Sequence, residues 1–231
     1  MSKTFYAGFE PNHSPVRVRL GVGVRHEVDT EVRNLGLSRA LVVTTPDQAE
    51  QGEEICSALG SLSHGLFARA TMHTPVDITD AALEVAEGAD CLIAIGGGST
   101  IGLTKALALR TDLPQIVLPT TYAGSEATPV LGQTRNGVKE TQRTPKVQPE
   151  VILYDPELVV SLPAALTVTS GLNAMAHAVE ALYAQDKNPL TDQLAVAGIR
   201  AFKEGLPQVV AEPHDLAARE KTQFGAWLCG T

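Results

Sequence analysis

Short apolar runs alternate with amphipathic segments along the first part of the chain. Residues 16–23 alternate apolar and charged positions, which is typical of a half-buried strand, and residues 40–45 form a compact β-branched run. A helical pattern follows at 48–59. Strands alternating with helices predict a mainly parallel sheet with helices on both faces. Further strands are expected at 65–70, 90–95, 115–119 and 151–154, and further helices at 77–87 and 99–110.

The apolar rhythm changes in two later places. Between residues 123 and 149, Gly and Pro punctuate polar residues, so we expect an exposed hairpin or excursion there. After Ser161 the sequence LPAALTVTSGLNAMAHAVEALYA is Ala-rich, with three-and-four spacing and no further strand signal. The fold class we predict is therefore α/β. A Rossmann-like parallel-sheet domain is expected over residues 1–160, and the beginning of an all-helical domain over 161–231.

Composition and charge narrow the class of protein. Hydrophobic residues make up 44% and charged residues 19%, as in ordinary folded domains. The net charge of −8 is spread along the chain, which argues against nucleic acid and anionic membranes as partners. Cys56, Cys91 and Cys229 lack CxxC spacing and are expected to be free thiols of a reducing cytoplasm. No run approaches the ~18 apolar residues of a membrane span.

A glycine-rich turn is the strongest local signal. Gly96, Gly97, Gly98 and Ser99 directly follow the apolar run CLIAI and precede a predicted helix. Glycines let the backbone approach phosphate oxygens, and the free amides at a helix start favour negative charge. The turn therefore predicts a diphosphate site, with a turn that serves only packing as the alternative.

Hydroxyl-bearing residues follow two other predicted strands. Thr120, Thr121 and Ser125 lie in the segment PTTYAGSE, where they would share a ligand crevice with the glycine turn. Taken alone, this segment is equally a generic polar loop. Thr44 and Thr45 end the strand at 40–45, where NAD-preferring folds often place a carboxylate for the adenine ribose, and Asp47 comes slightly late. We therefore expect that both NADH and NADPH are admissible.

Two polar residues share one face of the predicted helix after Ser161. Asn173 and His177 are four residues apart, so their side chains should lie on the same side. Facing a crevice, they could hold a substrate carbonyl or supply a proton near neutral pH. The alternative is a hydrogen-bonded core histidine.

Together, these segments resemble the iron-containing alcohol dehydrogenase superfamily, from about Val16 to the last residue. The resemblance implies that the turn from Gly96 to Ser99 binds the dinucleotide diphosphate. It also implies that Thr120, Thr121 and Ser125 line the nicotinamide side. The sequence DPEL, which begins at Asp155, leads into a helical metal-binding domain in this superfamily.

Two departures from the superfamily pattern are informative. Metal-dependent members carry an Asp four residues before the His, whereas this sequence has Asn173 before His177. An amide is a poorer ligand than a carboxylate for a hard cation, so we predict no catalytic metal. The pattern GGGSxxDxxK is also altered, with Gly102 in the Asp position and Lys105 retained.

These variants, with PTTYAGSEAT and SGLNAMAHAVEALYA, resemble the maleylacetate reductases of the superfamily. The resemblance implies NADH- or NADPH-dependent reduction of the carbon–carbon double bond of maleylacetate, a small dicarboxylate, to 3-oxoadipate in aromatic compound catabolism. His177 would then donate to the enolate or to a substrate carboxylate, and Asn173 would orient His177 or substrate. Tyr122 would offer its hydroxyl from the opposite wall. Lys146 would approach the nicotinamide ribose, or be a solvated surface lysine.

Two other functions stay open, and so does the assembly. One is a metal-dependent alcohol or polyol dehydrogenase of the same superfamily, and the other is a non-catalytic dinucleotide-binding fragment. Members of the superfamily normally carry more helical domain than this chain, which ends in a predicted helix. Exposed apolar surface around Trp227 and Leu228 is expected to favour association. A homodimer is common in similar proteins.

Overall fold

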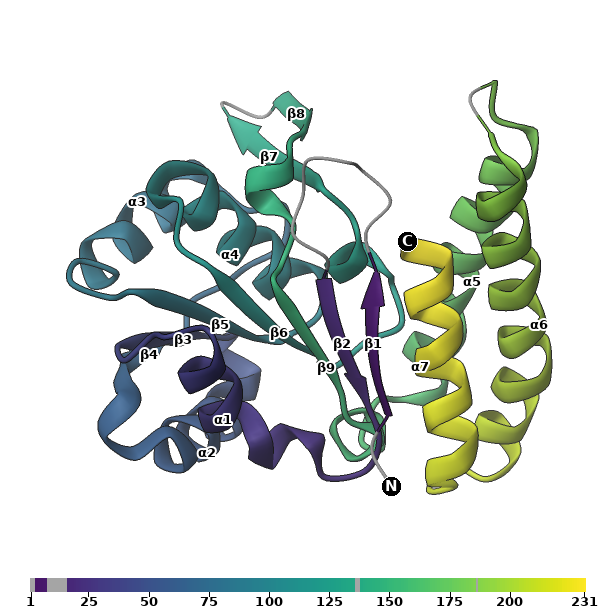
Figure 1. Ribbon diagram of the computed structural model, residues 1–231, viewed down its shortest axis with the longest axis horizontal. Coiled ribbons are helices and arrows are strands. Elements are labelled where there is room, and N and C mark those ends of the chain that lie inside the picture. The colour runs from purple at the N-terminus through teal and green to yellow at the C-terminus, as the bar shows by residue number, and fades with distance from the viewer. Residues whose placement is uncertain (1–2, 8–15, 136–137, 186) are drawn as a thin grey trace.

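The computed structural model describes residues 3–7, 16–135, 138–185 and 187–231, and a seven-stranded sheet forms its centre. The strand order is β1-β2-β9-β6-β5-β3-β4 (Figure 1). The six strands from β2 to β4 run parallel, and β1 pairs with β2 antiparallel. This confirms the predicted fold class. The strands are β1 (Lys3–Ala7), β2 (Val16–Leu20), β3 (Ala40–Val43), β4 (Ser63–Phe67), β5 (Cys91–Gly96), β6 (Gln115–Pro119) and β9 (Val151–Tyr154).

Helices cover both faces of the parallel strands because successive side chains point to opposite faces. Ala40 and Val42 pack with one layer of helices, while Leu41 and Val43 pack with the other. The first layer is α1 and α2, and the second is α3 and α4. These helices are α1 (Val28–Asn34), α2 (Ala49–Leu59), α3 (Val76–Val85) and α4 (Gly98–Thr111).

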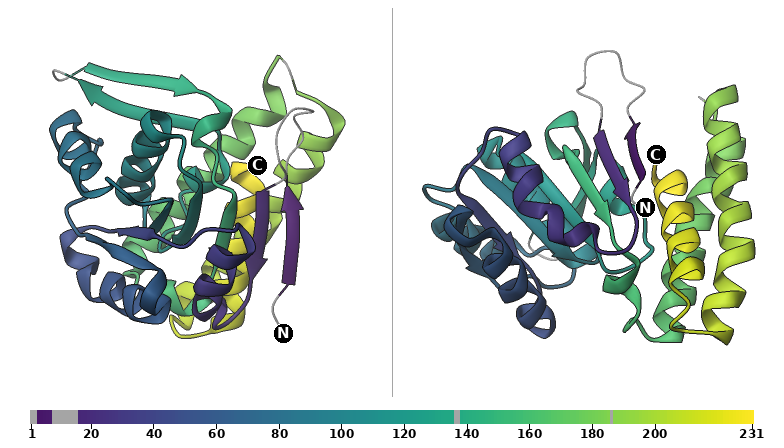
Figure 2. Two further views of the ribbon diagram at one scale, coloured as in Figure 1. Left: turned by 60° about the vertical axis from the view of Figure 1, so that its left-hand side comes forward. Right: turned by 60° about the horizontal axis from the view of Figure 1, so that its bottom comes forward.

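The predicted excursion after β6 contains an antiparallel hairpin of β7 (Val130–Arg135) and β8 (Val138–Arg143). It forms a separate two-stranded sheet, which lies above α3 and α4 in Figure 1 and in the left view of Figure 2. The polar, Gly- and Pro-punctuated sequence at 123–149 thus corresponds to an excursion outside the main sheet.

Three long helices follow the last strand and pack side by side on the β1–β2 side of the sheet (Figure 2). The turn from Pro156 to Val159 begins this segment, because the Asp155 carboxylate caps it by accepting from the Glu157 amide. The predicted helical segment is therefore confirmed. Its helices are α5 (Ala164–Tyr183), α6 (Pro189–Ala211) and α7 (Leu216–Gly230).

The expectation of exposed apolar surface at the end of α7 is wrong. Trp227 and Leu228 are only 8% and 7% exposed, because they pack against Val18 and Ile152 of the sheet. Large exposed apolar side chains of the helical segment lie instead on α5 and α6, and include Leu166, Leu172, Val179, Tyr183, Leu190, Val196 and Val210.

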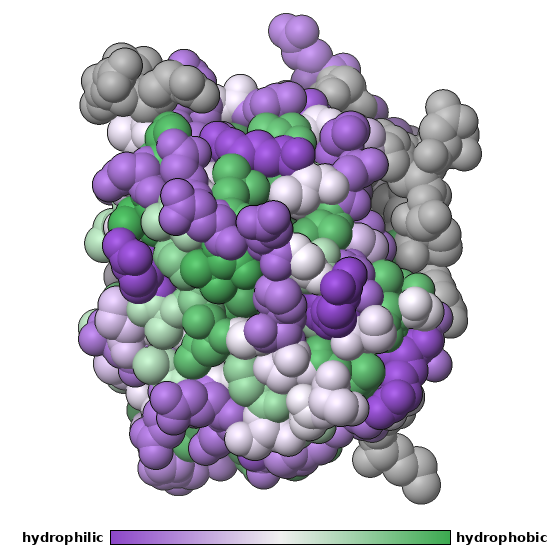
Figure 3. Space-filling model, turned by 90° about the vertical axis from the view of Figure 1, so that its left-hand side faces the viewer, coloured by the Kyte–Doolittle hydropathy of each residue, from purple (hydrophilic) through white to green (hydrophobic). Residues whose placement is uncertain are grey.

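Strand β4 is the edge of the sheet on the side opposite the long helices. Its residues are half-buried except for Phe67, which is buried. Figure 3 shows this side of the molecule, where apolar and polar residues intermingle. None of the helices in the described residues is both long and apolar enough to span a membrane.

Candidate functional site

The chain changes direction between β3 and β5. From β3 it continues through α2 to β4 on one side, and from β5 it continues through α4 to β6 on the other. In open parallel sheets, such a reversal leaves a crevice beyond the carboxyl ends of the two strands, where ligands bind. The glycine turn follows β5 directly, so it lies at this crevice.

The three glycines of the turn meet different surroundings. Gly96 has φ of 156°, and a Cβ there would lie 2.3 Å from Thr100 Oγ1. A Cβ on Gly97 would lie 2.7 Å from Thr121 Cγ2, whereas a Cβ on Gly98 would meet nothing within 4 Å. The first two glycines are therefore required by packing. The third leaves open space at the start of α4.

The first turn of α4 is suited to an anion. Its N-cap, Gly97, provides no side chain, and the Ile101 amide makes the first hydrogen bond, to the Gly97 carbonyl at 3.0 Å. The earlier amides, those of Gly98, Ser99 and Thr100, have no intrahelical carbonyl to bind, and the helix dipole adds positive potential there. An open glycine beside unpaired amides fits a dinucleotide diphosphate.

The loop after β6 is fastened to the glycine turn. The Thr120 amide donates to the Gly96 carbonyl at 3.0 Å, and Thr121 packs against Gly97. The structure thus brings the two predicted threonines beside the turn. Thr44 is fully buried, with its hydroxyl donating to the Gln48 carbonyl at 3.4 Å.

Gln48 links these segments, and the sequence pattern did not single it out. Its Nε2 donates to Thr120 Oγ1 at 2.9 Å and to Gln51 Oε1 at 3.1 Å. The apolar periodicity placed a helix start at this position, which describes the backbone but does not indicate where the side chain reaches.

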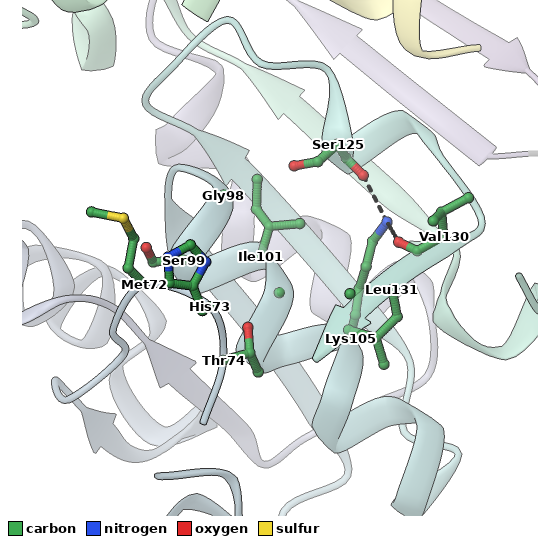
Figure 4. Close-up of a pocket in the computed structure, with 12 residues that line it drawn as sticks. Met72, His73, Thr74, Gly98, Ser99, Ile101, Lys105, Ser125, Val130 and Leu131 are labelled. Atoms are coloured by element: carbon green, nitrogen blue, oxygen red, sulfur yellow. Dashed lines mark hydrogen bonds between the residues drawn. The ribbon is translucent and has the colours of Figure 1, made fainter. Parts of the chain in front are cut away.

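A pocket of about 420 Å³ lies beside the start of α4 (Figure 4). His73 and Thr74 form one wall with left-handed φ values of 68° and 46°. Thr74 Oγ1 lies 2.6 Å from where a Cβ on Gly102 would be, so any larger residue there would meet this hydroxyl. Glycine at position 102 therefore leaves room for the loop formed by residues 71–75. The other wall includes Ser99, Lys105, Ser125 and Val130.

Lys105 fastens the second wall of this pocket to α4. Its Nζ donates to the carbonyls of Ser125 and Thr128, both at 2.6 Å, and to that of Val130 at 3.0 Å. Figure 4 shows two of these bonds. Burial lowers the pKa of Lys105 to about 7, and the nearby Glu126 carboxylate opposes this shift. Ser125 Oγ, also predicted from the sequence, is buried without a hydrogen-bond partner in the described residues.

The predicted pair on α5 lies on an exposed face of that helix. Asn173 is exposed, and His177 is 60% exposed with Nδ1 3.8 Å from Glu180 Oε2. Ser170, which shares this face by helical spacing, accepts from the Tyr122 amide at 3.4 Å. The polar face thus begins at the loop after β6. His177 is not a core histidine in this structure.

The side chains of Tyr122 and Lys146 are bound to partners elsewhere in the protein. The Tyr122 hydroxyl is buried and accepts from Arg219 Nη1 at 3.1 Å, and burial raises the pKa of Tyr122 to about 12. Lys146 is 54% exposed and pairs with Asp112 at 3.2 Å. Asp112 follows the last residue of α4, about 20 Å along the helix from the turn. This geometry agrees with the alternative that Lys146 is a surface lysine.

Groups of three or more His, Cys, Asp or Glu placed to hold a metal ion do not occur among the described residues. The absence of a catalytic metal stays a prediction.

Comparisons with known proteins show which family the chain resembles. The iron-containing alcohol dehydrogenase family model matches residues 15–156, and the model for the C-terminal part of the Fe-containing alcohol dehydrogenase family matches residues 167–231. A maleylacetate reductase from Rhizobium sp. (strain MTP-10005) is 57% identical over 220 residues, which cover 94% of this chain and 63% of that protein. The chain thus spans less than two thirds of the length of this relative.

Solved structures resemble the chain over nearly its whole length. The crystal structure of maleylacetate reductase from Agrobacterium tumefaciens has a TM-score of 0.93 at 55% identity, covering 100% of this chain and 65% of that one. Sulfoacetaldehyde reductase from Bifidobacterium kashiwanohense, in complex with NAD+, has a TM-score of 0.88 at 28% identity, with 96% and 66% covered.

Proposed function

Because the chain belongs to the iron-containing alcohol dehydrogenase family, we propose that it is the dinucleotide-binding and first helical part of an NAD(P)H-dependent maleylacetate reductase. The reaction is reduction of the carbon–carbon double bond of maleylacetate to 3-oxoadipate, in the degradation of aromatic compounds. The observation that carries this proposal is the 57% identity over 220 residues to a maleylacetate reductase.

The cofactor half of the proposal rests on the glycine turn. Gly98 and the unpaired amides of the first α4 turn would hold the diphosphate, and Ser99 lies in the same turn. Thr120, Thr121 and Ser125 come from the loop that is fastened to the turn through Gly96 and Lys105. We assign these three residues to the nicotinamide side of the cofactor. A relative at 28% identity has been solved with NAD+.

The substrate half of the proposal rests on the exposed face of α5. The reduced nicotinamide, when bound, would supply a hydride. Addition of this hydride to the substrate carbon β to the ketone would leave an enolate. His177 would donate a proton to this enolate, and Asn173 would hold the imidazole or a substrate carbonyl. Both side chains are exposed, so they are free to meet a ligand.

The assigned roles of two residues differ from the first expectation. The Tyr122 hydroxyl is already bound by Arg219, so we assign Tyr122 to the packing between the loop after β6 and the long helices. We leave Lys146 out of the site because it pairs with Asp112 at the far end of α4. A cytoplasmic homodimer that needs no catalytic metal completes the proposal.

The test uses the whole reductase that contains this chain. NADH absorbance is followed in the presence of freshly prepared maleylacetate, before and after dialysis of the enzyme against EDTA. We expect turnover that survives the chelator, since Asn173 replaces the metal-binding Asp of metal-dependent members. Asn173→Asp is the variant to compare with the unchanged protein, because it introduces the carboxylate of the metal-dependent members at an exposed position.

Each other outcome points to one alternative. Turnover lost on dialysis and restored by added zinc or iron would identify a metal-dependent dehydrogenase of the same family. NADH binding without any turnover would identify a dinucleotide-binding fragment. Absence of both binding and turnover would contradict the proposal as a whole.

A further inference from the structure

The amino group of Lys105 is occupied by the backbone of the loop after β6. Lys105 is 1% exposed, and its Nζ donates to the carbonyls of Ser125 and Thr128, both at 2.6 Å. A third bond, at 3.0 Å, goes to the Val130 carbonyl, and Figure 4 shows the side chain reaching this loop. A neutral amine has two N–H groups and an ammonium has three, so three carbonyls are satisfied only by the charged form. All three protons are then used within the protein, and Lys105 acts on the loop rather than on a ligand.

The position of Ser125 depends on these bonds. Its Oγ is buried without a hydrogen-bond partner in the described residues, so the hydroxyl itself does not fix the residue. Its carbonyl instead accepts from Lys105 Nζ at 2.6 Å and from Thr128 Oγ1 at 3.0 Å. Ser125 also lines the pocket of about 420 Å³ beside the start of α4. A buried hydroxyl left unpaired costs free energy, which a ligand in the pocket would recover by bonding to it.

The neighbouring Glu126 complements the charge of Lys105. Glu126 is fully buried, and its Oε1 accepts from the Tyr154 hydroxyl at 2.8 Å. Burial lowers the pKa of Lys105 and raises that of Glu126, while the attraction between the two side chains opposes both shifts. The loop is thus attached to α4 through Lys105 and to β9 through Tyr154.

We propose that Lys105 is a positioning residue for hydride transfer, because its ammonium holds residues 125–130 so that the Ser125 hydroxyl meets the bound nicotinamide. Lys105 itself touches neither cofactor nor substrate. This inference rests on the proposed function, because it requires a nicotinamide beside Ser125. It assigns to Lys105 an effect on the rate of reduction and little effect on cofactor affinity, since the diphosphate is held by the first amides of α4.

The first test is Lys105→Met in the whole reductase, which keeps a long side chain and removes the ammonium. We expect kcat for maleylacetate reduction, expressed per NADH-binding site, to fall by about 100-fold, the scale of a small misplacement of reacting groups. The dissociation constant for NADH should change less than about threefold, because the amides of the glycine turn remain. Amide hydrogen exchange in the cofactor-free enzyme should become faster at residues 125–130.

Ser125→Ala separates positioning from a general loss of structure. Alone, this change should lower kcat by about tenfold, the scale of one lost hydrogen bond. In the Lys105→Met background it should lower kcat less than about twofold, because the hydroxyl is already displaced. Two independent effects would multiply instead.

Thr104→Val is the matched control on the same helix. Thr104 is also buried, and its hydroxyl donates to the Thr100 carbonyl within α4 at 2.9 Å. This change should leave kcat, loop exchange and the effect of Ser125→Ala within about twofold of their original values.

Thr128→Ala tests the same cluster while Lys105 is kept. It removes the hydroxyl that donates to the Ser125 carbonyl. We expect a smaller fall in kcat, about threefold, and again a weakened effect of Ser125→Ala. This variant decides the question if Lys105→Met does not fold.

The outcomes separate this inference from the proposed function. Multiplying effects of Lys105→Met and Ser125→Ala would overturn the inference and leave the proposed function intact. So would a dissociation constant for NADH that rises as much as kcat falls, or an unchanged kcat in Thr128→Ala. A whole reductase that does not turn over maleylacetate before any substitution would contradict the proposed function itself.

Discussion

The glycine turn and the exposed face of α5 hold their polar groups in opposite ways. At the turn, the ligand-binding groups are backbone amides at the start of α4, and neighbouring threonines pack around Gly96 and Gly97. On α5, Asn173 and His177 project as exposed side chains, and His177 Nδ1 lies 3.8 Å from the Glu180 carboxylate. The first arrangement is fixed by the fold, whereas the second keeps rotamer freedom.

Because of this difference, the two regions should be sensitive to different kinds of substitution. A site made of backbone amides is damaged by changes that alter backbone conformation or fill its open space. A site made of exposed side chains is damaged by replacing those side chains, at little cost in stability. Cofactor binding should therefore respond to glycine substitutions, and catalysis should respond to substitutions on α5.

The largest effect is expected for Gly96→Ala. The new Cβ would lie 2.3 Å from Thr100 Oγ1, at a φ of 156° that residues with a side chain rarely adopt. The clash and the backbone strain together should lower the free energy of unfolding by roughly 3 kcal/mol. Chemical denaturation measures this change.

Gly98→Ala is the matched comparison within the same turn. Its Cβ meets nothing within 4 Å, and alanine favours the helix, so stability should stay constant or rise by up to ~1 kcal/mol. NADH binding should nevertheless weaken by about tenfold, because the methyl group occupies space beside the amides. Equal stability losses in the two variants would contradict this view of the turn.

The second effect concerns α5. His177→Gln should lower kcat for maleylacetate reduction by about 100-fold, the scale on which a general acid contributes. The dissociation constant for NADH should stay within about twofold, because the glycine turn is unchanged. His214→Gln, at another exposed histidine, is the control and should leave kcat unaltered. A loss of NADH affinity in His177→Gln would contradict the division between cofactor binding at the glycine turn and catalysis on α5.

Apolar periodicity was sufficient to predict most of the sheet. The strands at 115–119 and 151–154 have the predicted limits, because buried parallel strands are short, continuous apolar runs. It missed β1 (Lys3–Ala7), an antiparallel edge strand, and α1 (Val28–Asn34), which lies in a polar segment. Neither has a strong apolar pattern of its own.

The candidate site was predictable where chemistry depends on the backbone, and less so where it depends on side-chain reach. Consecutive glycines after an apolar run identify a turn from local sequence alone. Gln48 reaches Thr120 across 72 positions of sequence, and Thr74 fills the space left by Gly102. Such contacts depend on tertiary packing, so spacing along one segment does not reveal them.

The smallest effect is expected for Tyr122→Phe. This variant tests whether Tyr122 belongs with the groups that the fold holds in place or with the exposed catalytic side chains. Its hydroxyl accepts from Arg219 Nη1 at 3.1 Å, while Arg219 also donates to Thr167 Oγ1 at 3.1 Å and to the Val160 carbonyl at 3.2 Å. Removing one of these bonds should cost about 1 kcal/mol of unfolding free energy, because a buried donor loses one acceptor.

Activity distinguishes this packing role from catalysis. Tyr122→Phe should leave kcat within about twofold, since the hydroxyl is bound inside the junction between the loop after β6 and the long helices. Tyr183→Phe, at a side chain that is 72% exposed, is the control and should change neither quantity. A large fall in kcat with unchanged stability would instead make Tyr122 a catalytic residue, because the Arg219 bond would then have to open during the reaction.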